Sequence, residues 1–474
     1  YFQMCFFTII FIYYKITCIT SINLLSKYKL MSNIILEKYV TEKLLKKYFD
    51  KLYKICRSIM GNGFRDSLNI IGELVDLNIK KVKSGTNVLD WTVPDEWNIK
   101  DAYIVDPNGK KIAKFKQHNL HVVGYSEPVN KVLDLKELKK HLHTLPKLPN
   151  AIPYVTTYYK RNWGFCIKHN DYKKLVPGKY RVFIDSTIKP GHLVYSDKLI
   201  KGKSKKEILL STYLCHPQMA NHELSGPLAW SMLYKIIKDT GPHKYSYRFL
   251  ICPENIGAAA FLHYSKKKIN NIAAGYIINC VGNGKKFTYK KSRIGDSLAD
   301  NAALNVLKYS KTKLDIVDFF PDGSDERQFC SPGFNLPIGL IMRNMYGRQD
   351  GSKMDFPEYH TSLDDENKIS FKTIIETIQV YLDVLKTIEN NFVPIGRVQY
   401  GTPQLSKSPI KLYGEMMNFR IKEKNEKTRV LLEILNLADG KLDLLSIANK
   451  KDFKLIDHYQ TISDLIKVKY IKTK

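Results

Sequence analysis

The sequence predicts an α/β fold with a doubly wound, mainly parallel sheet, an inserted β-rich domain and a C-terminal winged-helix domain. The main evidence is that apolar strands and amphipathic helices alternate between about residues 207 and 390. Strands separated by helices of about ten or more residues usually form a parallel sheet. Short strands with Pro and Gly between them fill residues 88–195, and short helices follow residue 410.

The length and composition exclude several classes of protein. The 474 residues are more than one compact core usually contains, and 44% hydrophobic with 12% aromatic residues suffice for packed cores. A mainly disordered chain, a collagen-like repeat and a disulfide-stabilised miniprotein are therefore excluded. Eight cysteines without a paired CxxC spacing indicate a reduced intracellular chain, so we expect a cytoplasmic protein.

Residues 1–30 are set apart from the predicted fold. The apolar run from Met4 to Tyr14 is shorter than the roughly 20 residues that a membrane-spanning helix needs. It also lacks the basic start and cleavage site of a secretory signal. We interpret these residues as translated upstream sequence or a tag, with a weak membrane anchor as the alternative. The expected domains that follow are the α/β domain (31–87 and 196–398), the inserted β-rich domain (88–195) and the winged-helix domain (399–474).

Each predicted element depends on a local pattern. From Ile34 to Val75 apolar residues recur at three-and-four spacing, which indicates helices. Asn108-Gly109 lies between alternating segments and predicts a hairpin turn. The Gly- and Pro-containing stretch after Pro394 predicts a linker. In the main domain the predicted order is strand 207–215, helix 226–239, strand 247–253, helix 257–267, strand 274–282, helix 300–311, strand 336–342 and helix 371–390.

The net charge of +29 raises the question of a nucleic-acid or membrane partner. Of the 75 basic residues only 12 are Arg, and the 63 Lys are spread along the chain. Specific recognition of phosphates and bases depends largely on the planar fork of Arg. We therefore interpret the charge as compositional, rather than as evidence for nucleic acid or an anionic membrane as a partner.

Polar residues follow the predicted strands of the main domain. His216 and Glu254 come directly after two of these strands, and Asn279 lies at the end of a third. Asp325 is in a later loop, and His360 follows the last strand. Because ligands bind beyond the carboxyl ends of the strands in such sheets, we expect these side chains to converge on one site.

Imidazoles and carboxylates from separate strand ends are the groups that a catalytic zinc site needs. Three protein ligands leave a fourth position open, and the metal lowers the pKa of water there. A carboxylate that does not bind the metal then moves the proton, and Glu254 suits this role. Each residue alone has an ordinary alternative, since a lone His216 is more often structural and Glu254 could cap a helix. Cys215, Cys252 and Cys280 are interpreted as small core residues.

The order of these motifs resembles that of the zinc aminopeptidase clan that includes glutaminyl cyclases. The motifs are His-Pro, Leu-Ser-Gly, Glu-x-Ile-Gly, Asn-Cys-Val-Gly, Ser-Asp-Glu and His-Thr-Ser-x-Asp. More closely, STYLCHPQMAN, ELSGP, DGSDERQF and YHTSLDD resemble a bacterial aminopeptidase-like family, and LDWTVPDEWNI, NLHVVGYSEPV and YYKRNWGFC resemble its inserted domain. The resemblance spans roughly residues 35–474. It implies a sheet of zinc-aminopeptidase type, an inserted β domain, a C-terminal winged helix and a link to surface-polysaccharide biosynthesis.

The resemblance also implies roles for individual residues. His216 matches the first metal-binding histidine of the clan and His360 matches the last. Glu254 matches the general base, and Asp325 matches an acid that orients the site or relays a proton.

Three positions depart from the clan's pattern. His222, with Glu223 beside it, stands where the clan has a metal-bridging Asp, and Asn255 and Asn279 replace two further carboxylates. Neutral groups cannot offset two adjacent dications. We therefore expect one Zn per chain, bound by His216, His360 and either His222 or Glu223.

The expected function is a zinc-dependent amide hydrolase of aminopeptidase type, acting on a modified sugar or amino-acid conjugate. Its partner would be a small-molecule or peptide-like amide substrate. One alternative is a degraded aminopeptidase-like protein that binds a ligand without hydrolysis. Another is a DNA-binding regulator that uses the winged helix. The sequence predicts neither the substrate nor the oligomeric state.

Overall fold

The computed structural model describes residues 36–284, 286–346, 355–408 and 426–474. The chain divides into two units, Tyr1–Thr41 and Glu42–Lys474. Residues 1–30, interpreted above as upstream sequence, a tag or a weak anchor, lie outside the described residues. The folded domains discussed below all belong to the second unit.

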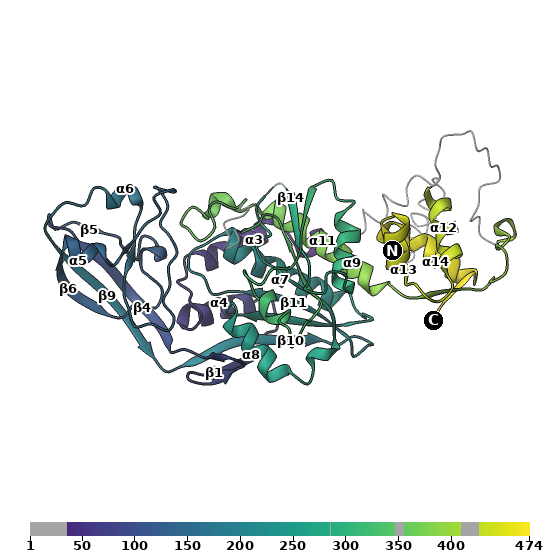
Figure 1. The fold of residues 1–474 in the computed structure, drawn as a ribbon, viewed down its shortest axis with the longest axis horizontal. Coiled ribbons are helices and arrows are strands. Elements are labelled where there is room, and N and C mark those ends of the chain that lie inside the picture. The colour runs from purple at the N-terminus through teal and green to yellow at the C-terminus, as the bar shows by residue number, and fades with distance from the viewer. Residues whose placement is uncertain (1–35, 285, 347–354, 409–425) are drawn as a thin grey trace, which may run out of the picture. The chain divides into compact units, whose positions relative to one another are not determined.

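An eight-stranded sheet forms the centre of the main domain (Figure 1). The order across the sheet is β1-β10-β12-β11-β13-β16-β14-β15. The four middle strands, β12, β11, β13 and β16, are parallel, whereas β10 and β14 each run antiparallel to a neighbour. The strands are β1 (Ile79–Lys83), β10 (His192–Ile200), β11 (Glu207–Tyr213), β12 (Ser246–Cys252), β13 (Ile272–Ile277), β14 (Lys286–Lys290), β15 (Lys313–Val317) and β16 (Ile338–Met342).

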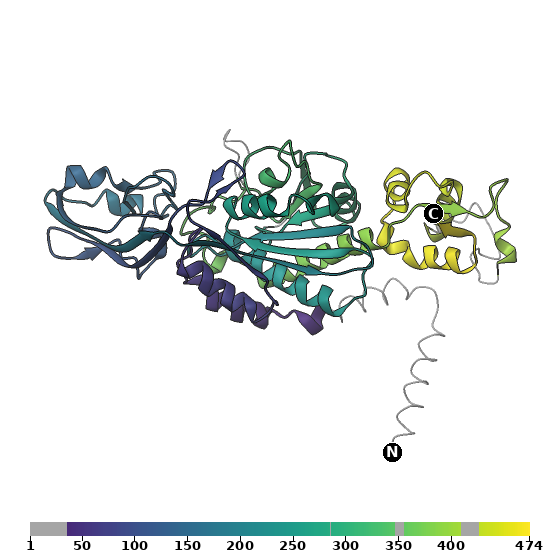
Figure 2. The same ribbon diagram turned by 90° about the horizontal axis from the view of Figure 1, so that it is seen from below.

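Helices cover both faces of this sheet (Figure 2). Contacts join α3, α7, α9 and α11 into one layer, and α8 and α10 contact each other. Every residue of β11 and β12 is buried, as expected for strands covered on both faces. The helices of this domain are α3 (Glu42–Tyr53), α4 (Asn62–Gly72), α7 (Asn221–Asp239), α8 (Ile256–Ser265), α9 (Leu298–Leu307), α10 (Glu326–Phe329) and α11 (Phe371–Glu389), with the 3₁₀ helices η2 (Ile269–Asn271) and η3 (Glu366–Lys368).

The predicted doubly wound sheet is confirmed. The eight strands and helices expected between residues 207 and 390 correspond to β11, α7, β12, α8, β13, α9, β16 and α11. The sequence pattern missed the outer strands β1, β10, β14 and β15 as members of this sheet. These strands have charged or exposed residues at one or both ends, so they lack the continuous apolar runs of the buried strands.

A separate four-stranded antiparallel sheet follows the order β5-β4-β9-β6. The predicted hairpin turn is present between β4 and β5, where Gly109 has a φ of 79° and donates its N–H to the Asp106 carbonyl. The elements of this region are β2 (Asn87–Val88), β3 (Trp91–Thr92), β4 (Glu96–Val105), β5 (Lys111–Ile112), η1 (Asn119–His121), β6 (Val129–Asp134), α5 (Leu135–Lys139), β7 (Leu142–His143), β8 (Phe165–Cys166), α6 (His169–Tyr172) and β9 (Lys179–Lys189).

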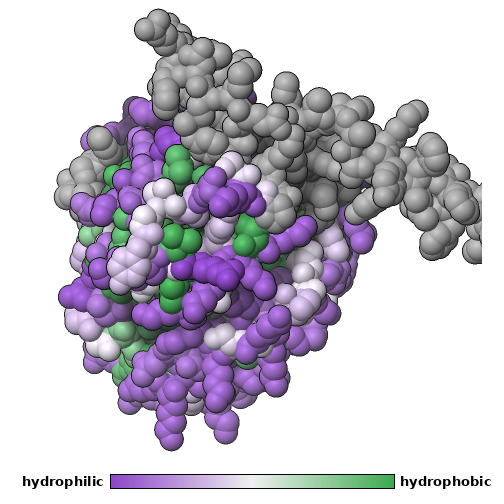
Figure 3. Space-filling view, turned by 90° about the vertical axis from the view of Figure 1, so that its right-hand side faces the viewer, coloured by the Kyte–Doolittle hydropathy of each residue, from purple (hydrophilic) through white to green (hydrophobic). Residues whose placement is uncertain are grey.

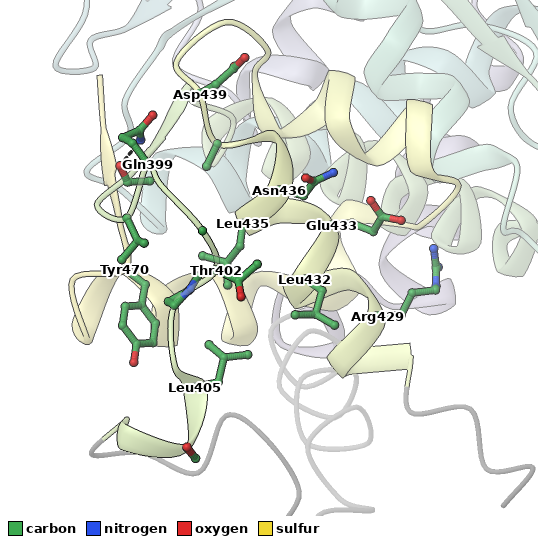
Figure 4. A pocket seen from close by; sticks show the side chains of 16 residues that line it. Gln399, Thr402, Leu405, Arg429, Leu432, Glu433, Leu435, Asn436, Asp439 and Tyr470 are labelled. Carbon is green, nitrogen blue, oxygen red and sulfur yellow. Dashed lines mark hydrogen bonds between the residues drawn. The ribbon is translucent and has the colours of Figure 1, made fainter. Parts of the chain in front are cut away.

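The C-terminal region is a small helical unit with a two-stranded sheet. Its first strand, β17, lies at the start of the stretch that the sequence predicted as a linker. The local pattern did not indicate this strand because its partner, β18, comes from the end of the chain. Figure 4 shows a groove of this unit, whose described lining residues come from 396–406, 429–439 and Tyr470 and include none of the candidate site residues. The elements are β17 (Pro394–Gly396), η4 (Leu405–Lys407), α12 (Glu426–Leu437), α13 (Leu444–Lys451), η5 (Leu455–His458), α14 (Tyr459–Lys467) and β18 (Ile471–Thr473).

The surface agrees with the Lys-rich composition. The face in Figure 3 is mostly hydrophilic, and its apolar residues form small separate patches. Within the part of the chain that the structure describes, no helix has the length and apolar character needed to cross a membrane.

Candidate metal centre

Three histidines from distant parts of the chain lie together. Ligand-type ring nitrogens of His216, His222 and His360 all lie within 4.8 Å of one another. The Nε2 atoms of His222 and His360 are 3.2 Å apart. His216 and His222 are buried, and His360 is partly buried. His216 follows β11, His222 is in the first turn of α7, and His360 is in the loop before α11.

Hydrogen bonds on the far side of two rings select which nitrogen faces the group. Nδ1 of His216 lies 2.9 Å from Oε2 of Glu223, and a carboxylate accepts the proton there. Nδ1 of His222 lies 3.0 Å from the Tyr213 hydroxyl. With protons on both Nδ1 atoms, the Nε2 lone pairs are left free. Metal-binding histidines commonly have their second nitrogen held in this way.

Burial keeps two of the imidazoles neutral. It lowers the pKa of His222 and His360 well below the ordinary value, and charge on the neighbouring His216 lowers both further. Burial opposes charge on His216 as well, but Cys215 and Glu223 raise its pKa well above the ordinary value, so a metal bound there would displace the Nε2 proton. Neutral imidazoles are the form that binds metal.

Glu223 lies behind His216, bound to an arginine. Its Oε1 lies 3.4 Å from Nε of Arg57, and both side chains are fully buried. The same Arg57 nitrogen donates to the His216 carbonyl oxygen at 2.9 Å. Of the two residues that the sequence left open as the third ligand, the structure places His222 in the histidine group and Glu223 on the outer side of His216.

Glu254 lies beside the histidine group. Its Oε2 is 3.6 Å from Nε2 of His216, the nitrogen that faces the group. Burial raises the pKa of the Glu254 carboxyl, although charge on His216 opposes the shift. A raised pKa brings a carboxylate closer to the range in which it accepts and returns a proton near neutral pH.

An unusual turn follows Glu254. Asn255 has φ 61° and ψ −64°, and the Ile256 N–H donates to the Glu254 carbonyl oxygen at 2.8 Å. This is the geometry of a γ-turn that residues other than glycine rarely adopt. Strained backbone of this kind is typical of functional sites. The sequence predicts this helix from residue 257, and α8 begins at Ile256, directly after the turn.

Asp325 holds the turn. Its Oδ1 accepts the Asn255 N–H at 2.5 Å, and its Oδ2 lies 3.7 Å from Sγ of Cys252. Burial raises the pKa of Asp325 well above the ordinary value, and the charge of Glu254 adds to the shift. Asp325 therefore contacts the backbone of the residue that follows Glu254, and it does not belong to the histidine group.

Asp364 connects two of the histidines and was not among the predicted site residues. Its two carboxylate oxygens accept the N–H groups of Asn221 and His222 at 2.8 and 2.9 Å, at the start of α7. It lies four residues after His360 in the same loop. Burial raises its pKa to about 7, although both N–H groups oppose the shift. Asp364 is the last residue of the His-Thr-Ser-x-Asp motif, but no role was predicted for it.

The inserted region reaches the histidine group through Tyr154. The Tyr154 ring meets those of His216 and His360 edge-on, with centroids 5.3 and 5.2 Å apart. Its backbone N–H donates to the His360 carbonyl oxygen at 2.9 Å. On the other side, the Tyr359 ring stacks on His360 at 3.9 Å. The sequence signal for Tyr154 was only a short strand pattern, which does not indicate contact with a distant loop.

Glycine at position 226 allows α7 to approach the end of the sheet. A Cβ there would lie 2.2 Å from the Ile278 carbonyl oxygen. The preceding Ser225 hydroxyl accepts the Val281 N–H at 3.0 Å. The Ser-Gly pair therefore positions the helix that carries His222 against the segment after β13.

Comparison with known proteins identifies the family. The family model with the description "Domain of unknown function (DUF4910)" matches residues 46–391, and a winged helix-turn-helix model matches residues 394–473. The chain belongs to the DUF4910 family. A protein of Clostridium acetobutylicum, named for polysaccharide biosynthesis and an aminopeptidase-like domain, is 42% identical over 402 residues, which are 85% of this chain and 89% of that protein.

Solved structures show the aminopeptidase-like fold of this DUF4910 chain. A crystal structure described as a peptidase from Clostridium acetobutylicum has 38% identity and a TM-score of 0.85, covering 95% of this chain and all of that one. A zinc aminopeptidase from Bacillus subtilis has 13% identity and a TM-score of 0.51, covering 72% of this chain and 94% of that one. A peptidase M28 precursor from Shewanella amazonensis has 11% identity and a TM-score of 0.52, covering 77% and 97%. The last two show similarity of fold.

The positions at which this DUF4910 chain departs from the clan's pattern are accounted for as follows. The Asn255 side-chain oxygen accepts from Nε of Arg327 at 2.5 Å, so it is engaged with Arg327. Both polar atoms of the Asn279 side chain are buried and have no hydrogen-bond partner among the described residues. Cys215, Cys252 and Cys280 are buried, as expected for core residues.

The histidine group fits a single zinc ion. Its donors are three imidazole nitrogens, a set that zinc accepts in catalytic sites with a fourth position open. The 3.2 Å separation of Nε2 in His222 and His360 is close to the spacing of two nitrogens that share one tetrahedral zinc at about 2.0–2.1 Å. The DUF4910 chain therefore provides three convergent donors and a nearby carboxylate at Glu254.

Proposed function

We propose that the protein is a zinc-dependent amide hydrolase with one zinc per chain, held by Nε2 of His216, His222 and His360. The observation that carries this proposal is the approach of Glu254 to within 3.6 Å of the His216 nitrogen that faces the group. A nitrogen that binds the metal and a carboxylate that does not bind it then lie next to each other, as metal-assisted hydrolysis requires.

Bound zinc would supply a Lewis acid that polarises the amide carbonyl and makes water easier to deprotonate. Glu254 accepts the proton of the attacking water on its carboxylate and returns it to the nitrogen of the leaving amine. Asp325 keeps Glu254 in place through the Asn255 backbone N–H. Glu223 accepts the Nδ1 proton of His216 and so keeps its Nε2 free.

The substrate class is proposed from two observations. The similar protein of Clostridium acetobutylicum is named for polysaccharide biosynthesis, which supports an amide of a modified sugar or an amino-acid conjugate. The inserted region contributes Tyr154 to the wall of the site, and this limits the bulk of a substrate beside His216 and His360. Both observations favour a small polar amide as the substrate, rather than a long unfolded peptide.

Metal content is the first test. The full chain is saturated with zinc, dialysed and measured by elemental analysis, beside the single variants His216→Ala, His222→Ala and His360→Ala. We expect about one zinc per chain for the wild type and loss in each variant. His192→Ala is the matched control, because His192 is an exposed histidine on β10. A wild type that retains no zinc contradicts the proposal.

Turnover is the second test. Zinc-loaded wild type and Glu254→Gln are compared for amine release from a panel of N-acyl sugars and aminoacyl amides. The variant keeps its zinc and loses roughly 100-fold or more of the rate, because the proton has no acceptor. A protein that binds one zinc and releases no amine from any member of the panel instead supports the alternative of a ligand-binding protein.

A further inference from the structure

Arg327 lies next to the turn that carries Glu254. Its Nε donates to the Asn255 side-chain oxygen at 2.5 Å, and Asn255 directly follows Glu254 in the chain. This bond uses one of the five N–H groups of the guanidinium. The two terminal nitrogens have no hydrogen-bond partner among the described residues.

Arg327 has no acidic partner in the part of the chain that the structure describes. The acids beside it in the sequence are both engaged elsewhere. Glu326 pairs with Lys290 at 2.7 Å in a fully buried ion pair, and Asp325 accepts the Asn255 N–H. Arg327 itself is only partly buried, so its charge is neither neutralised by a carboxylate nor fully hydrated.

An aromatic side chain and a short strand held by the inserted region lie beside Arg327. The guanidinium carbon lies 6.0 Å from the ring centroid of Trp91, which is half-buried on β3. Tyr159 of the inserted region donates its hydroxyl to the Thr92 carbonyl oxygen and holds this short strand. Arg161 of the inserted region differs in one respect, since it already pairs at 3.0 Å with Asp95, four residues after Trp91. Arg327 is thus held through its Nε, while its two terminal nitrogens stay available.

We propose that Arg327 is an anion-binding subsite that holds a carboxylate or phosphate group of the substrate beside the amide to be cleaved. This inference rests on the proposed hydrolase function and specifies its substrate as an acidic amide. The planar guanidinium fork pairs with both anions through two parallel N–H bonds. Trp91 supplies an apolar face next to the charge, against which the carbon skeleton of the substrate packs.

Three hydroxamic acids of matched length test the subsite. Each binds zinc through the hydroxamate, and they differ at the far end: succinic acid monohydroxamate has a carboxylate, 3-phosphonopropanohydroxamic acid a phosphonate, and butanohydroxamic acid a methyl group. Their affinities for the zinc-loaded full chain are measured by calorimetry for wild type, Arg327→Gln, Arg327→Lys and Arg161→Gln. Zinc content is recorded for each sample.

Wild type and Arg161→Gln should bind at least one anionic probe about tenfold or more tighter than the neutral one, as expected for a charge-assisted pair. Arg327→Gln should lose this preference and keep its affinity for the neutral probe, and Arg327→Lys should restore part of it. The tighter anionic probe identifies the group as carboxylate or phosphate. Equal binding of all three probes by zinc-loaded wild type overturns the subsite and leaves the hydrolase proposal standing. A wild type without zinc overturns both.

Discussion

The Glu223 carboxylate lies 2.9 Å from Nδ1 of His216, on the side of the ring away from the other two histidines. This single contact decides how His216 presents its second nitrogen, and it connects the histidine group to the buried Arg57. Outer partners of this kind orient a ligand and raise its basicity.

Glu223→Gln is expected to weaken zinc binding by about 10- to 100-fold, because the neutral amide accepts the His216 proton less strongly. It also leaves Arg57 buried without a counter-charge, so the free energy of unfolding falls. Zinc affinity is measured by competition with a chelator. Glu207→Gln is the control, since Glu207 pairs with Arg248 in the same sheet without contact to the histidines. Equal zinc affinity in Glu223→Gln and wild type contradicts the role of Glu223.

Asp364→Asn should disturb both His222 and His360. The amide has one acceptor oxygen in place of two, so one of the N–H groups at the start of α7 loses its partner. We expect a loss of about 1–3 kcal/mol in the free energy of unfolding and weaker zinc binding. Asp365→Asn is the control, because Asp365 is only partly buried and its side chain caps η3, and it should leave zinc affinity unchanged. The measurements are urea unfolding and chelator competition, and identical behaviour of the two variants would argue against the link.

Tyr154→Ala and Tyr154→Phe separate the ring from its hydroxyl. The ring packs on His216 and His360, whereas the hydroxyl meets that of Tyr158 at 2.9 Å. Tyr154→Ala should release zinc roughly tenfold faster, because the apolar shell of the site is opened to water. Tyr154→Phe should retain the wild-type rate of release, measured by stopped-flow with a chromogenic chelator. A faster release in Tyr154→Phe would instead assign the effect to the hydroxyl.

Acid should weaken the contact between β4 and α4. Arg65 donates to Oε2 of Glu96 at 2.8 Å, and this hydrogen bond lowers the pKa of the Glu96 carboxyl from 4.5 to about 2, although burial opposes the shift. A lowered folded-state pKa stabilises the protein above pH 4.5, and this contribution is lost as the pH falls towards 2. Thermal unfolding of wild type and Glu96→Gln between pH 6 and 2 checks this. At pH 6 the free energy of unfolding of the two proteins should differ by about 1–3 kcal/mol. The two curves should converge at the acid end, and a constant gap would contradict the assignment.

Asn305→Ala should loosen the C-terminal unit. The Asn305 amide donates to Asn449 and Phe453, and its oxygen accepts the Leu455 N–H at 3.0 Å. Its removal leaves buried backbone groups without partners, at about 1–3 kcal/mol. Hydrogen exchange of residues 444–467 should accelerate. Asn301→Ala, on the same helix, is the control, because the Asn301 side chain donates to the Asp296 carbonyl oxygen instead. Equal exchange in both variants would exclude Asn305 as the main connection.

Much of the fold could be predicted from sequence because its signals are local. The buried strands β11, β12, β13 and β16 are mainly apolar, and each is followed by a segment with helical periodicity. β10 was missed because it crosses residue 195, where the inserted domain was predicted to end. The outer strands β1, β14 and β15 were missed because five-residue strands with Lys at one end or both are stabilised by pairing with a neighbour, which no local pattern indicates. β17 shows the same effect, since its partner β18 lies at the other end of the unit.

The meeting of imidazoles and a carboxylate at one edge of the sheet could be predicted from the residue types that follow the strand ends. That His222 faces the group while its neighbour Glu223 lies behind His216 became visible only in the folded chain. The tertiary structure also showed the parts that Asp364 and Tyr154 play. Asp364 is 143 positions away from Asn221, whose N–H it accepts. Hydrogen bonds over such separations depend on how helices and loops pack against the sheet, and that packing is a property of the whole chain.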